Sequence, residues 1–400
     1  MLSLRGLIAV VFVSCAASFI ALPEQVTASV EYFPVPSVSS TRNDGSDAGL
    51  LVPILITDPD GELKYIVAPM LIRNSIVGTR GALNVFRYEP GGREMRFIGS
   101  FTERIERKVV FSYADPAFDQ GRYSLNFGAA FFKNATSRFF DLGQATQESK
   151  ETNYTARETR LDWRFGVHAN EVTQIAVGQR LRDVHLQKGA TDLPFTGDRF
   201  PQVDGVQGES LILGHRATFY YDTRNNLVTP TDGMAVTAYA ELNQNLRNGD
   251  HPVYSRYEIE VKKLFPSESK RAILVVRGDL QATIGSQVPF FEQSSLGGQN
   301  NLRGFGGDRF IDKHLVSLSI EERIHLGRAK VAGVNADFEI APFLDTGQVF
   351  SDYKKVSFHS YRLTPGIGFR GVVRPNVVGR VDYGYSREGG AIFAGLDFPY

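Results

Sequence analysis

Cysteine and net charge are the two features that this chain most clearly lacks. Its 400 residues include a single cysteine, Cys15, which excludes a disulfide framework. Its 44 lysines and arginines balance its 44 aspartates and glutamates, whereas a nucleic-acid-binding domain is expected to carry a basic stripe. No two of its seven histidines lie three to five residues apart, so a local histidine-based zinc motif is excluded. We therefore expect neither a nucleic-acid partner nor a metal.

Catalytic motifs and long apolar runs are also missing. The sequence contains no Gly-x-Ser-x-Gly elbow, no His-Glu-x-x-His pair and no Walker loop. Glu258 and Glu260 could form a carboxylate dyad, but no serine–histidine pair accompanies them. After the amino-terminal leader, no run of about 18 apolar residues occurs. The sequence thus predicts that the protein is not an enzyme and has neither catalytic residues nor a cofactor. It also predicts that the protein is not a helical membrane protein.

The first residues of the chain are typical of an export signal. Arg5 precedes an apolar run over 7–22 that is too short for a comfortable membrane span, and a small-residue cleavage site, Val26-Thr27-Ala28, follows it. Residues 1–28 are therefore predicted to be a signal peptide. The alternative is lipoprotein processing before Cys15, although the residue three positions before that cysteine is unfavourable for it.

Much of the remaining chain alternates apolar and polar residues with a period of two. In one such segment Tyr257 and Ile259 lie on one face while Glu258 and Glu260 lie on the other. A soluble β-sandwich would also alternate, but its strands are nearer five or six residues in length, and these run to about ten to thirteen. Long strands with charged residues on one face are typical of an antiparallel transmembrane β-barrel with a polar lumen.

Sixteen strands are predicted, an even number as in bacterial single-chain barrels. Residues 29–62 are rich in proline, serine and glycine and alternate poorly, so they are predicted to be a periplasmic lead-in, and 63–400 the barrel domain. The predicted strands are 63–72, 80–88, 94–101, 107–114, 121–133, 153–166, 171–184, 210–221, 233–246, 252–264, 271–284, 313–324, 334–346, 359–370, 375–386 and 391–399.

A glycine-rich stretch, Leu296–Phe310, interrupts the alternation between two predicted strands. Its glycines at 297, 298, 304, 306 and 307 permit positive φ angles and close backbone approach. Arg303 and Arg309 add planar, permanently charged forks that require carboxylate partners. We expect an ordered loop that folds against acidic groups; the alternative is a solvated hairpin tip with incidental arginines.

Within this stretch, Leu302-Arg303-Gly304-Phe305 resembles the arginine-glycine-aromatic motif in the sixth extracellular loop of the BamA/TamA surface-antigen superfamily of outer-membrane barrels, which includes FhaC-type secretion pores. Further segments agree with that family. Residues 221–233 resemble its periplasmic turn, 319–326 its twelfth strand, 341–350 its thirteenth, and 365–370 with 391–400 its carboxyl end. The resemblance covers roughly residues 211–400, and the first half of the chain matches only in its alternation.

The resemblance implies a long extracellular loop that folds into the lumen, where Arg303 of the Arg303-Gly304-Phe305 motif pairs with an acidic residue of a Phe-x-Asp-x-Gly motif. Here that motif is Phe343-Leu344-Asp345-Thr346-Gly347, and alternation independently points Asp345 inward. The alternative for Asp345 is an ordinary hydrated lumen charge. Other lumen charges are expected at Glu321, Arg323, Asp337 and Glu339. Phe398 and Tyr400 resemble the carboxyl-terminal insertion signal that the barrel-assembly machinery reads.

Most family members carry periplasmic POTRA domains before the barrel, but residues 29–62 are too few to bury the core of one such domain. A barrel-only member is therefore expected. The resemblance implies an assembly or translocation factor of the bacterial outer membrane, in contact with its lipid, that moves or inserts a client protein or lipid. Two alternatives remain open. One is a passive or gated pore plugged by its loop, and the other is a structural barrel or a pore that serves a separate periplasmic partner.

Overall fold

A computed structural model describes residues 29–32, 34–41, 43–269, 271–331, 334–374, 377–395 and 397–400, so the predicted signal peptide lies outside the described residues. Within them, no helix has the length and apolar character needed to cross a membrane. The strands are β1 (Ser29–Tyr32), β2 (Val35–Thr41), β3 (Gly45–Leu51), β4 (Ile54–Thr57), β5 (Leu63–Asn74), β6 (Gly78–Glu89), β7 (Arg93–Thr102), β8 (Arg107–Phe118), β9 (Tyr123–Phe139), β10 (Thr152–Asn170), β11 (Thr173–Lys188), β12 (Glu209–Asp222), β13 (Gly233–Asn245), β14 (Val253–Pro266), β15 (Ala272–Gly285), β16 (Ser294–Leu296), β17 (Phe310–Asp312), β18 (His314–Val331), β19 (Val334–Phe350), β20 (Arg362–Val373), β21 (Val377–Ser386) and β22 (Gly389–Gly395). The helical turns are η1 (Pro90–Gly92), η2 (Glu148–Lys150), α2 (Thr196–Arg199), η3 (Phe290–Glu292), η4 (Tyr353–Lys355) and η5 (Phe358–Ser360).

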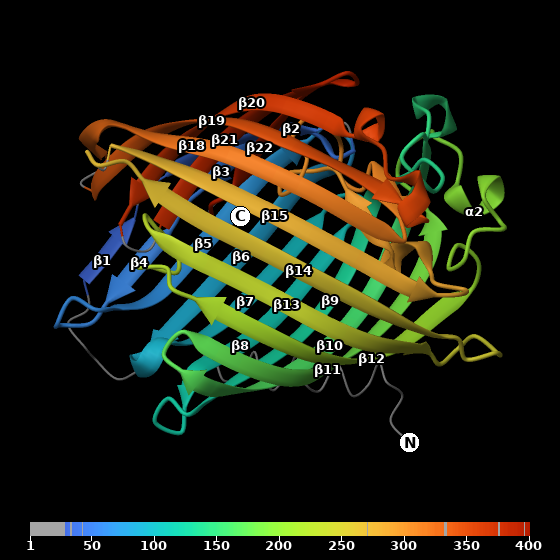
Figure 1. The fold of residues 1–400 in the computed structure, drawn as a ribbon. Coiled ribbons are helices and arrows are strands. Elements are labelled where there is room, and N and C mark those ends of the chain that lie inside the picture. Colours follow the sequence, from blue (N-terminus) through green and yellow to red (C-terminus); the bar gives the residue numbers. More distant parts are fainter. Residues whose placement is uncertain are drawn as a thin grey trace.

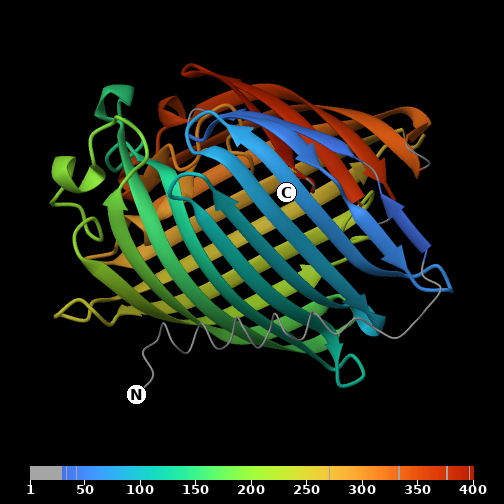
Figure 2. The same cartoon turned by 180° about the vertical axis from the view of Figure 1, so that it is seen from behind.

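Every described strand except β16 and β17 belongs to one antiparallel sheet that closes on itself as a barrel (Figures 1 and 2). From β5 onward each strand of this sheet pairs with the next one in the chain, and β15 passes directly to β18. The ring closes where β2 meets β22, with Ser40 opposite Ile392. One end of the barrel carries mostly short turns, such as the one at 171–172, and the other carries the longer loops 140–151, 189–208 and 286–313. We call them the short-turn end and the long-loop end.

The barrel has 18 strands, so the prediction of sixteen is wrong. Each of the sixteen predicted segments overlaps a strand, and the two additional strands of the ring arise from residues 29–57, which the sequence predicts to be lead-in. β1 pairs with β4 and β2 pairs with β3, while both β3 and β4 pair with β5. β3 and β4 together therefore form one strand of the ring, and β1 and β2 together form the next. Pro53, which has no N–H to donate, separates β3 from β4. Serine and glycine fill many positions here, so the contrast between the two faces is too weak to be recognised in the sequence.

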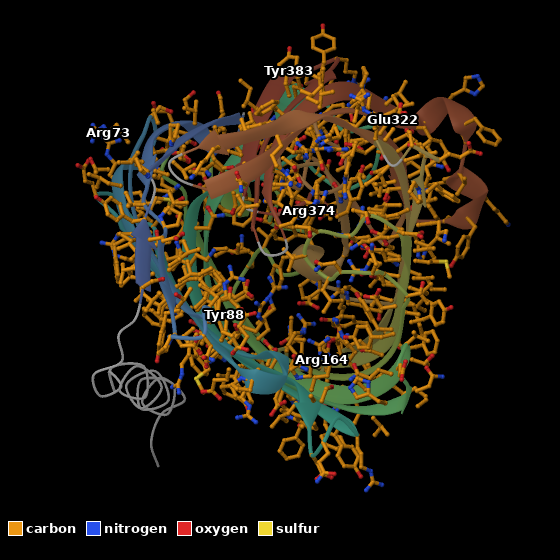
Figure 3. The ribbon with its side chains drawn as sticks, turned by 90° about the vertical axis from the view of Figure 1, so that its left-hand side faces the viewer. Arg73, Tyr88, Arg164, Glu322, Arg374 and Tyr383 are labelled. Carbon is orange, nitrogen blue, oxygen red and sulfur yellow. The ribbon has the colours of Figure 1, made fainter. Side chains whose placement is uncertain are left out.

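The two faces of the barrel wall differ in polarity as the alternation predicts. On β15, Leu274 and Leu280 are 38% and 54% exposed, whereas Arg277 and Asp279 between them are 8% and 2% exposed. Figure 3 views the barrel from the left-hand end of Figure 1 and shows Tyr383 pointing away from the ring of strands. An apolar outer face around a charged inner face is the arrangement that a lipid bilayer requires of a barrel.

The predicted long glycine-rich loop, 285–312, is not present in that form. It contains η3 and a two-stranded sheet in which β16 pairs with β17, from Ser294 opposite Asp312 to Leu296 opposite Phe310. We call residues 294–312 the hairpin segment. Its backbone groups at both ends pair with each other, and its apolar side chains pack against β18 and β19 in one buried cluster, comprising Leu296, Leu302, Phe305, Phe310, Leu315 and Val349. The segment is therefore an ordered element and not a free loop.

Candidate functional site

Arg303, at the turn of the hairpin segment, lies in a fully enclosed polar site. Its Nε and Nη2 donate to the two carboxylate oxygens of Asp345 on β19, each at 2.9 Å, and its backbone N–H donates to the same group at 3.1 Å. Its Nη1 donates to Glu321 on β18 at 2.8 Å. All three side chains are fully buried. The structure thus brings together the arginine and the aspartate that the resemblance pairs.

A network of further charges surrounds this pair. Arg370 on β20 donates to Glu321 at 3.0 Å and contacts Asp382 on β21 at 2.7 Å. Asp382 also accepts from Arg380 at 2.7 Å, and Arg323 donates through Nε to Glu321 at 3.0 Å. The members come from four strands and the hairpin segment, so the network ties the segment to one side of the barrel wall. Because each charge has opposite charges beside it, burial does not leave an isolated ion in the site.

Each residue of the two predicted motifs has an identifiable contact. Gly304 has a φ of 128°, and a Cβ there would come within 3.1 Å of the backbone of Tyr385, so only glycine fits without strain. Phe305 packs edge-on against Phe310 at 5.2 Å in the apolar cluster of the hairpin segment. The ring of Phe343 lies 3.4 Å below the guanidinium of Arg303, in cation–π geometry.

Gly347, the last residue of the strand motif, makes room for the hairpin segment. A Cβ at this position would lie 3.1 Å from the side chain of Leu296 and 2.9 Å from the carbonyl of Val316. The two motifs are therefore complementary. One supplies the arginine and a glycine that permits close approach, and the other supplies the acceptor, the aromatic ring beneath the guanidinium and the space for Leu296.

The charge state of Arg303 follows from these contacts. Burial by itself would lower the pKa of Arg303, but its hydrogen bonds and charge interactions with Asp345 and Glu321 raise that pKa above its ordinary value. The guanidinium therefore stays charged in the folded protein at neutral pH. Charge-assisted, bidentate bonds of this kind fix one orientation of the arginine.

Arg309, the second arginine of the segment, binds a different part of the wall. Its Nε donates to Glu388, in the turn before β22, at 2.8 Å, and its Nη1 donates to the hydroxyl of Thr146 at 2.8 Å. Its guanidinium also lies 4.2 Å from the ring of Phe140. Both arginines of the glycine-rich stretch thus have the carboxylate partners that their chemistry requires.

Phe398 and Tyr400 lie beyond β22 and contact buried arginines of the network. The hydroxyl of Tyr400 accepts from Nη2 of Arg303 at 3.2 Å, and the ring of Phe398 lies 3.5 Å from the guanidinium of Arg323. Tyr400 also packs against the apolar side chains of Leu264, Ile273 and Val275. A role for these residues as an insertion signal stays a prediction, and their contacts add a second role, in which they cover the charge network from one side.

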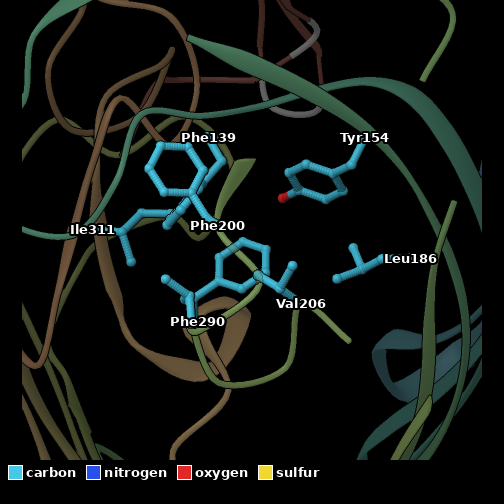
Figure 4. Packing of buried hydrophobic residues seen from close by; sticks show 8 residues of the cluster. Phe139, Tyr154, Leu186, Phe200, Val206, Phe290 and Ile311 are labelled. Atoms are coloured by element: carbon cyan, nitrogen blue, oxygen red, sulfur yellow. The ribbon is translucent and has the colours of Figure 1, made fainter. Parts of the chain in front are cut away.

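A second charged site, absent from the sequence prediction, anchors η3. Glu292 is fully buried and accepts from Arg180 at 2.7 Å and from Arg182 at 2.6 Å, with Arg256 at 3.4 Å. Although burial alone would raise it, these three guanidinium groups hold the pKa of Glu292 well below its usual value. Neighbouring Phe290 packs into an apolar cluster that joins β9, β10, β11, the α2 loop and β17 (Figure 4). The stretch before the hairpin segment is thus held to the wall by its own ion pairs and apolar contacts.

Asp337 and Glu339, also predicted as lumen charges, belong to neither site. Both are buried on β19, nearer the short-turn end, where Arg328 donates to Asp337 at 2.7 Å and Arg374 donates to Glu339 at 3.1 Å. The prediction missed Arg370 and Asp382, although the alternation of β20 and β21 places both on the inner face and could have found them. For Glu292 we see no sequence signal, because it lies outside any alternating segment. No cluster of three or more metal-ligating side chains occurs among the described residues.

The seam at which the barrel closes differs from the other strand pairs. Within the residues that the structure describes, β2 and β22 share a single register pair, Ser40 with Ile392. By contrast, β2 pairs with β3 over its whole length, from Val35–Leu51 to Thr41–Gly45. Among the described strand pairs of the barrel sheet, the pair at the seam therefore has the shortest ladder.

Comparison with known proteins places this geometry among related barrels. The model of the Omp85 superfamily domain matches residues 91–383. Among solved structures, the chain is similar to BamA from Haemophilus ducreyi lacking POTRA domains 1–3, with a TM-score of 0.58 and 15% identity over 98% of this chain and 78% of that one. It is also similar to CdiB from Acinetobacter baumannii, with a TM-score of 0.52 and 12% identity over 93% of this chain and 66% of that one. No curated protein matches the sequence significantly.

Proposed function

The chain belongs to the Omp85 superfamily and is an outer-membrane β-barrel, and from this premise we infer that it inserts or moves polypeptides at the bacterial outer membrane. The observation that carries this proposal is the seam between β2 and β22. A strand edge with few ladder partners is the part of a sheet that another strand can most easily join. An opened seam would offer a client strand two free edges, one on β2 and one on β22, in the manner of β-strand addition.

The seam can be tested with an engineered disulfide, because the only native cysteine lies in the predicted signal peptide. Ser40→Cys and Ile392→Cys occupy the directly opposed positions of β2 and β22, where antiparallel Cα atoms approach closely enough for a bridge. A matched control places the same bridge in the continuous wall, at Leu280→Cys and Val316→Cys of β15 and β18.

Insertion of a radiolabelled client barrel into proteoliposomes is the measurement. We expect the oxidised seam variant to lose insertion and to recover it on reduction, while the control bridge leaves insertion unchanged. Full insertion through the oxidised seam would contradict the proposal that the seam opens. No insertion by the wild-type protein, with any client tried, would contradict the proposed function as a whole.

A gated pore is a second candidate, and the two anchored sites favour it. The hairpin segment and η3 are both held against the inner face of the wall by buried ion pairs, which would set the conductance of the barrel if solutes pass through it. Single-channel recording in planar bilayers separates the two proposals. A constant conductance that no client alters, together with absent insertion, would favour the pore.

A further inference from the structure

A polar cavity of about 550 Å³ lies at the short-turn end of the barrel, on the inner face of β18 and β19. The turns that follow β12, β14 and β20 complete its lining, which includes Arg271, Arg323, Arg328, Arg374, Asp337 and Glu339. Figure 3, seen from this end, shows Arg374 within the ring of strands. Its Nη1 donates to the carbonyl of Thr229 in the turn after β12, so that turn reaches across the mouth of the barrel.

Arg323 has unused bonding capacity in this cavity. It is 2% exposed, its Nε is bound to Glu321, and the ring of Phe398 packs on its guanidinium. Its Nη1 and Nη2 have no hydrogen-bond partner within the described part of the chain. The other arginines on β18 and beside β20 differ, since Arg328 and Arg374 pair with Asp337 at 2.7 and 3.4 Å. A buried guanidinium fork without an acceptor is costly unless a ligand supplies one.

An unused acceptor lies in the same cavity. Glu339 is 3% exposed and binds Arg374 through Oε1, while its Oε2 has no partner among the described residues. No ion pair within 4.0 Å joins Glu339 to Arg323 in this part of the structure. Arg323 and Glu339 thus bring a planar pair of unpaired donors and a separate unpaired acceptor to the wall of this cavity.

We propose that this cavity binds an entering polypeptide through an acidic side chain, with the carboxylate on the Nη1–Nη2 fork of Arg323 and a neighbouring N–H of the peptide on Oε2 of Glu339. The proposal rests on the proposed function, and it specifies the kind of polypeptide segment that would bind at the short-turn end of the barrel. A guanidinium fork matches the geometry of a carboxylate, which accepts two parallel bonds. A peptide carries an amide donor beside each acidic side chain, as the second orphan group requires. The cavity opens on the charged inner face and not on the apolar outer one, which favours a peptide over a lipid.

The test uses the full-length barrel in detergent and a fluorescein-labelled decapeptide of alternating serine and valine with one central glutamate. A second peptide carries glutamine at that position, and fluorescence anisotropy gives both dissociation constants. We expect the glutamate peptide to bind about tenfold more tightly than the glutamine peptide. Arg323→Lys keeps the charge but loses the fork, and Arg323→Gln loses both, so each should reduce this ratio to about one. Arg122→Gln is the matched control, because Arg122 is exposed in the turn between β8 and β9 at the same end, outside the cavity.

Glu339→Gln provides an independent variant that leaves Arg323 in place. It removes a negative charge beside the bound carboxylate, so the ratio between the two peptides should rise above the wild-type value. If the Arg323 variants fail to give a heat-modifiable, folded barrel, the binding ratio of Glu339→Gln tests the proposal instead. Equal binding of the two peptides to the wild-type protein, or an unchanged ratio in the Arg323 and Glu339 variants, would overturn the proposal.

Binding to lipid vesicles tests whether Arg323 recognises a lipid phosphate and not a peptide carboxylate. Binding of phosphatidylglycerol vesicles that depends on Arg323, with no peptide binding, would also overturn the proposal, since the cavity would then recognise a lipid phosphate. The outcome is separable from that of the seam experiment. Normal client insertion by Arg323→Gln would contradict the acidic-peptide site but would leave the proposed function of the barrel supported.

Discussion

At the scale of single residues, two buried charged side chains anchor the hairpin segment and η3 to the inner face of the barrel wall. Arg303 bonds to Asp345 and Glu321 within the charge network, and Glu292 bonds to Arg180 and Arg182 at η3. Replacement of both partners of such a pair by apolar residues can be harmless, whereas removal of one partner leaves an uncompensated buried charge. Single substitutions at these positions are therefore informative.

Arg303→Ala should destabilise the hairpin segment by about 3–5 kcal/mol, because Asp345 and Glu321 would remain buried without their shared partner. Asp345→Asn should cost less, since Arg303 keeps Glu321 and an amide oxygen can still accept its backbone N–H. The double variant should show a coupling of about 0.5–3 kcal/mol in urea unfolding from liposomes. Additive effects would mean that the two side chains do not act together, in contrast to their contact in the structure. Protease sensitivity between Gly304 and Gly307 should rise in step with the loss of stability.

The pH dependence of stability should report on Glu292. Its pKa in the folded protein is lowered by Arg180, Arg182 and Arg256, so its ionised form stabilises the fold at every pH above the ordinary carboxyl value of about 4.3. This contribution is lost as the pH falls through the lower folded value. Glu292→Gln should thus reduce the urea midpoint at pH 7 and show a smaller further decrease between pH 7 and pH 3 than the wild type. The same pH dependence in both proteins would exclude Glu292 as the titrating group.

At the scale of elements, period-two alternation determines which side of each strand faces lipid. On β15 and β18 the register opposes Val276 to Ile320 on the outer face, and Gln281 and Ser317 lie on the inner face. A shift of one residue in register would exchange the two sets completely. The hairpin segment shows the opposite behaviour, since tertiary contacts and not periodicity determine its conformation.

Arginine substitutions on the two faces should therefore differ in cost. Leu274→Arg or Ile320→Arg should cost about 2–4 kcal/mol near the midplane of the bilayer, whereas Gln281→Arg should cost little, because it faces the polar interior. Folding into liposomes, followed by heat-modifiable mobility, measures both. Equal costs on the two faces would contradict the register of β15 and β18.

The carboxyl-terminal aromatic residues combine a proposed signal with a structural contact. Deletion of Phe398 to Tyr400 should leave the protein exported but uninserted, if the assembly machinery reads these residues. Tyr400→Phe keeps the aromatic ring and loses only the hydroxyl that accepts from Arg303, so it should insert normally and show faster proteolysis of the hairpin segment. Normal amounts of protease-resistant barrel from the deletion would argue against the signal.

At the scale of the whole molecule, closure depends on the residues 29–57. They provide the two strands that lie between β5 and β22, and the turn between β2 and β3 reaches the hairpin segment, where Asn43 donates to the carbonyl of Gly307 at 2.7 Å. The amino-terminal strands are thus part of both the wall and the anchoring of the segment.

Deletion of residues 30–57 should accordingly prevent closure in the native register. β5 would then have to pair directly with β22, and the hairpin segment would lose the hydrogen bond from Asn43 to Gly307. We expect less than a tenth of the wild-type yield of heat-modifiable barrel, and the exported chain should be degraded. A stable barrel of normal yield and conductance would show that the first two strands are dispensable.

Alternation in the sequence predicts segments that overlap the strands from β5 onward and predicts the polarity of the two faces, while the pairing of Arg303 with Asp345 is implied by the family resemblance. Periodicity and short motifs such as those around Arg303 and Asp345 are local, so the chain shows them directly. The strand number follows from tertiary contacts, because β2 and β3 carry serine or glycine at many positions and their places in the wall are set by pairing with β22 and β5. The tertiary structure alone revealed Glu292 and the free fork of Arg323, since burial and unused hydrogen-bonding capacity arise from neighbours far apart in the chain.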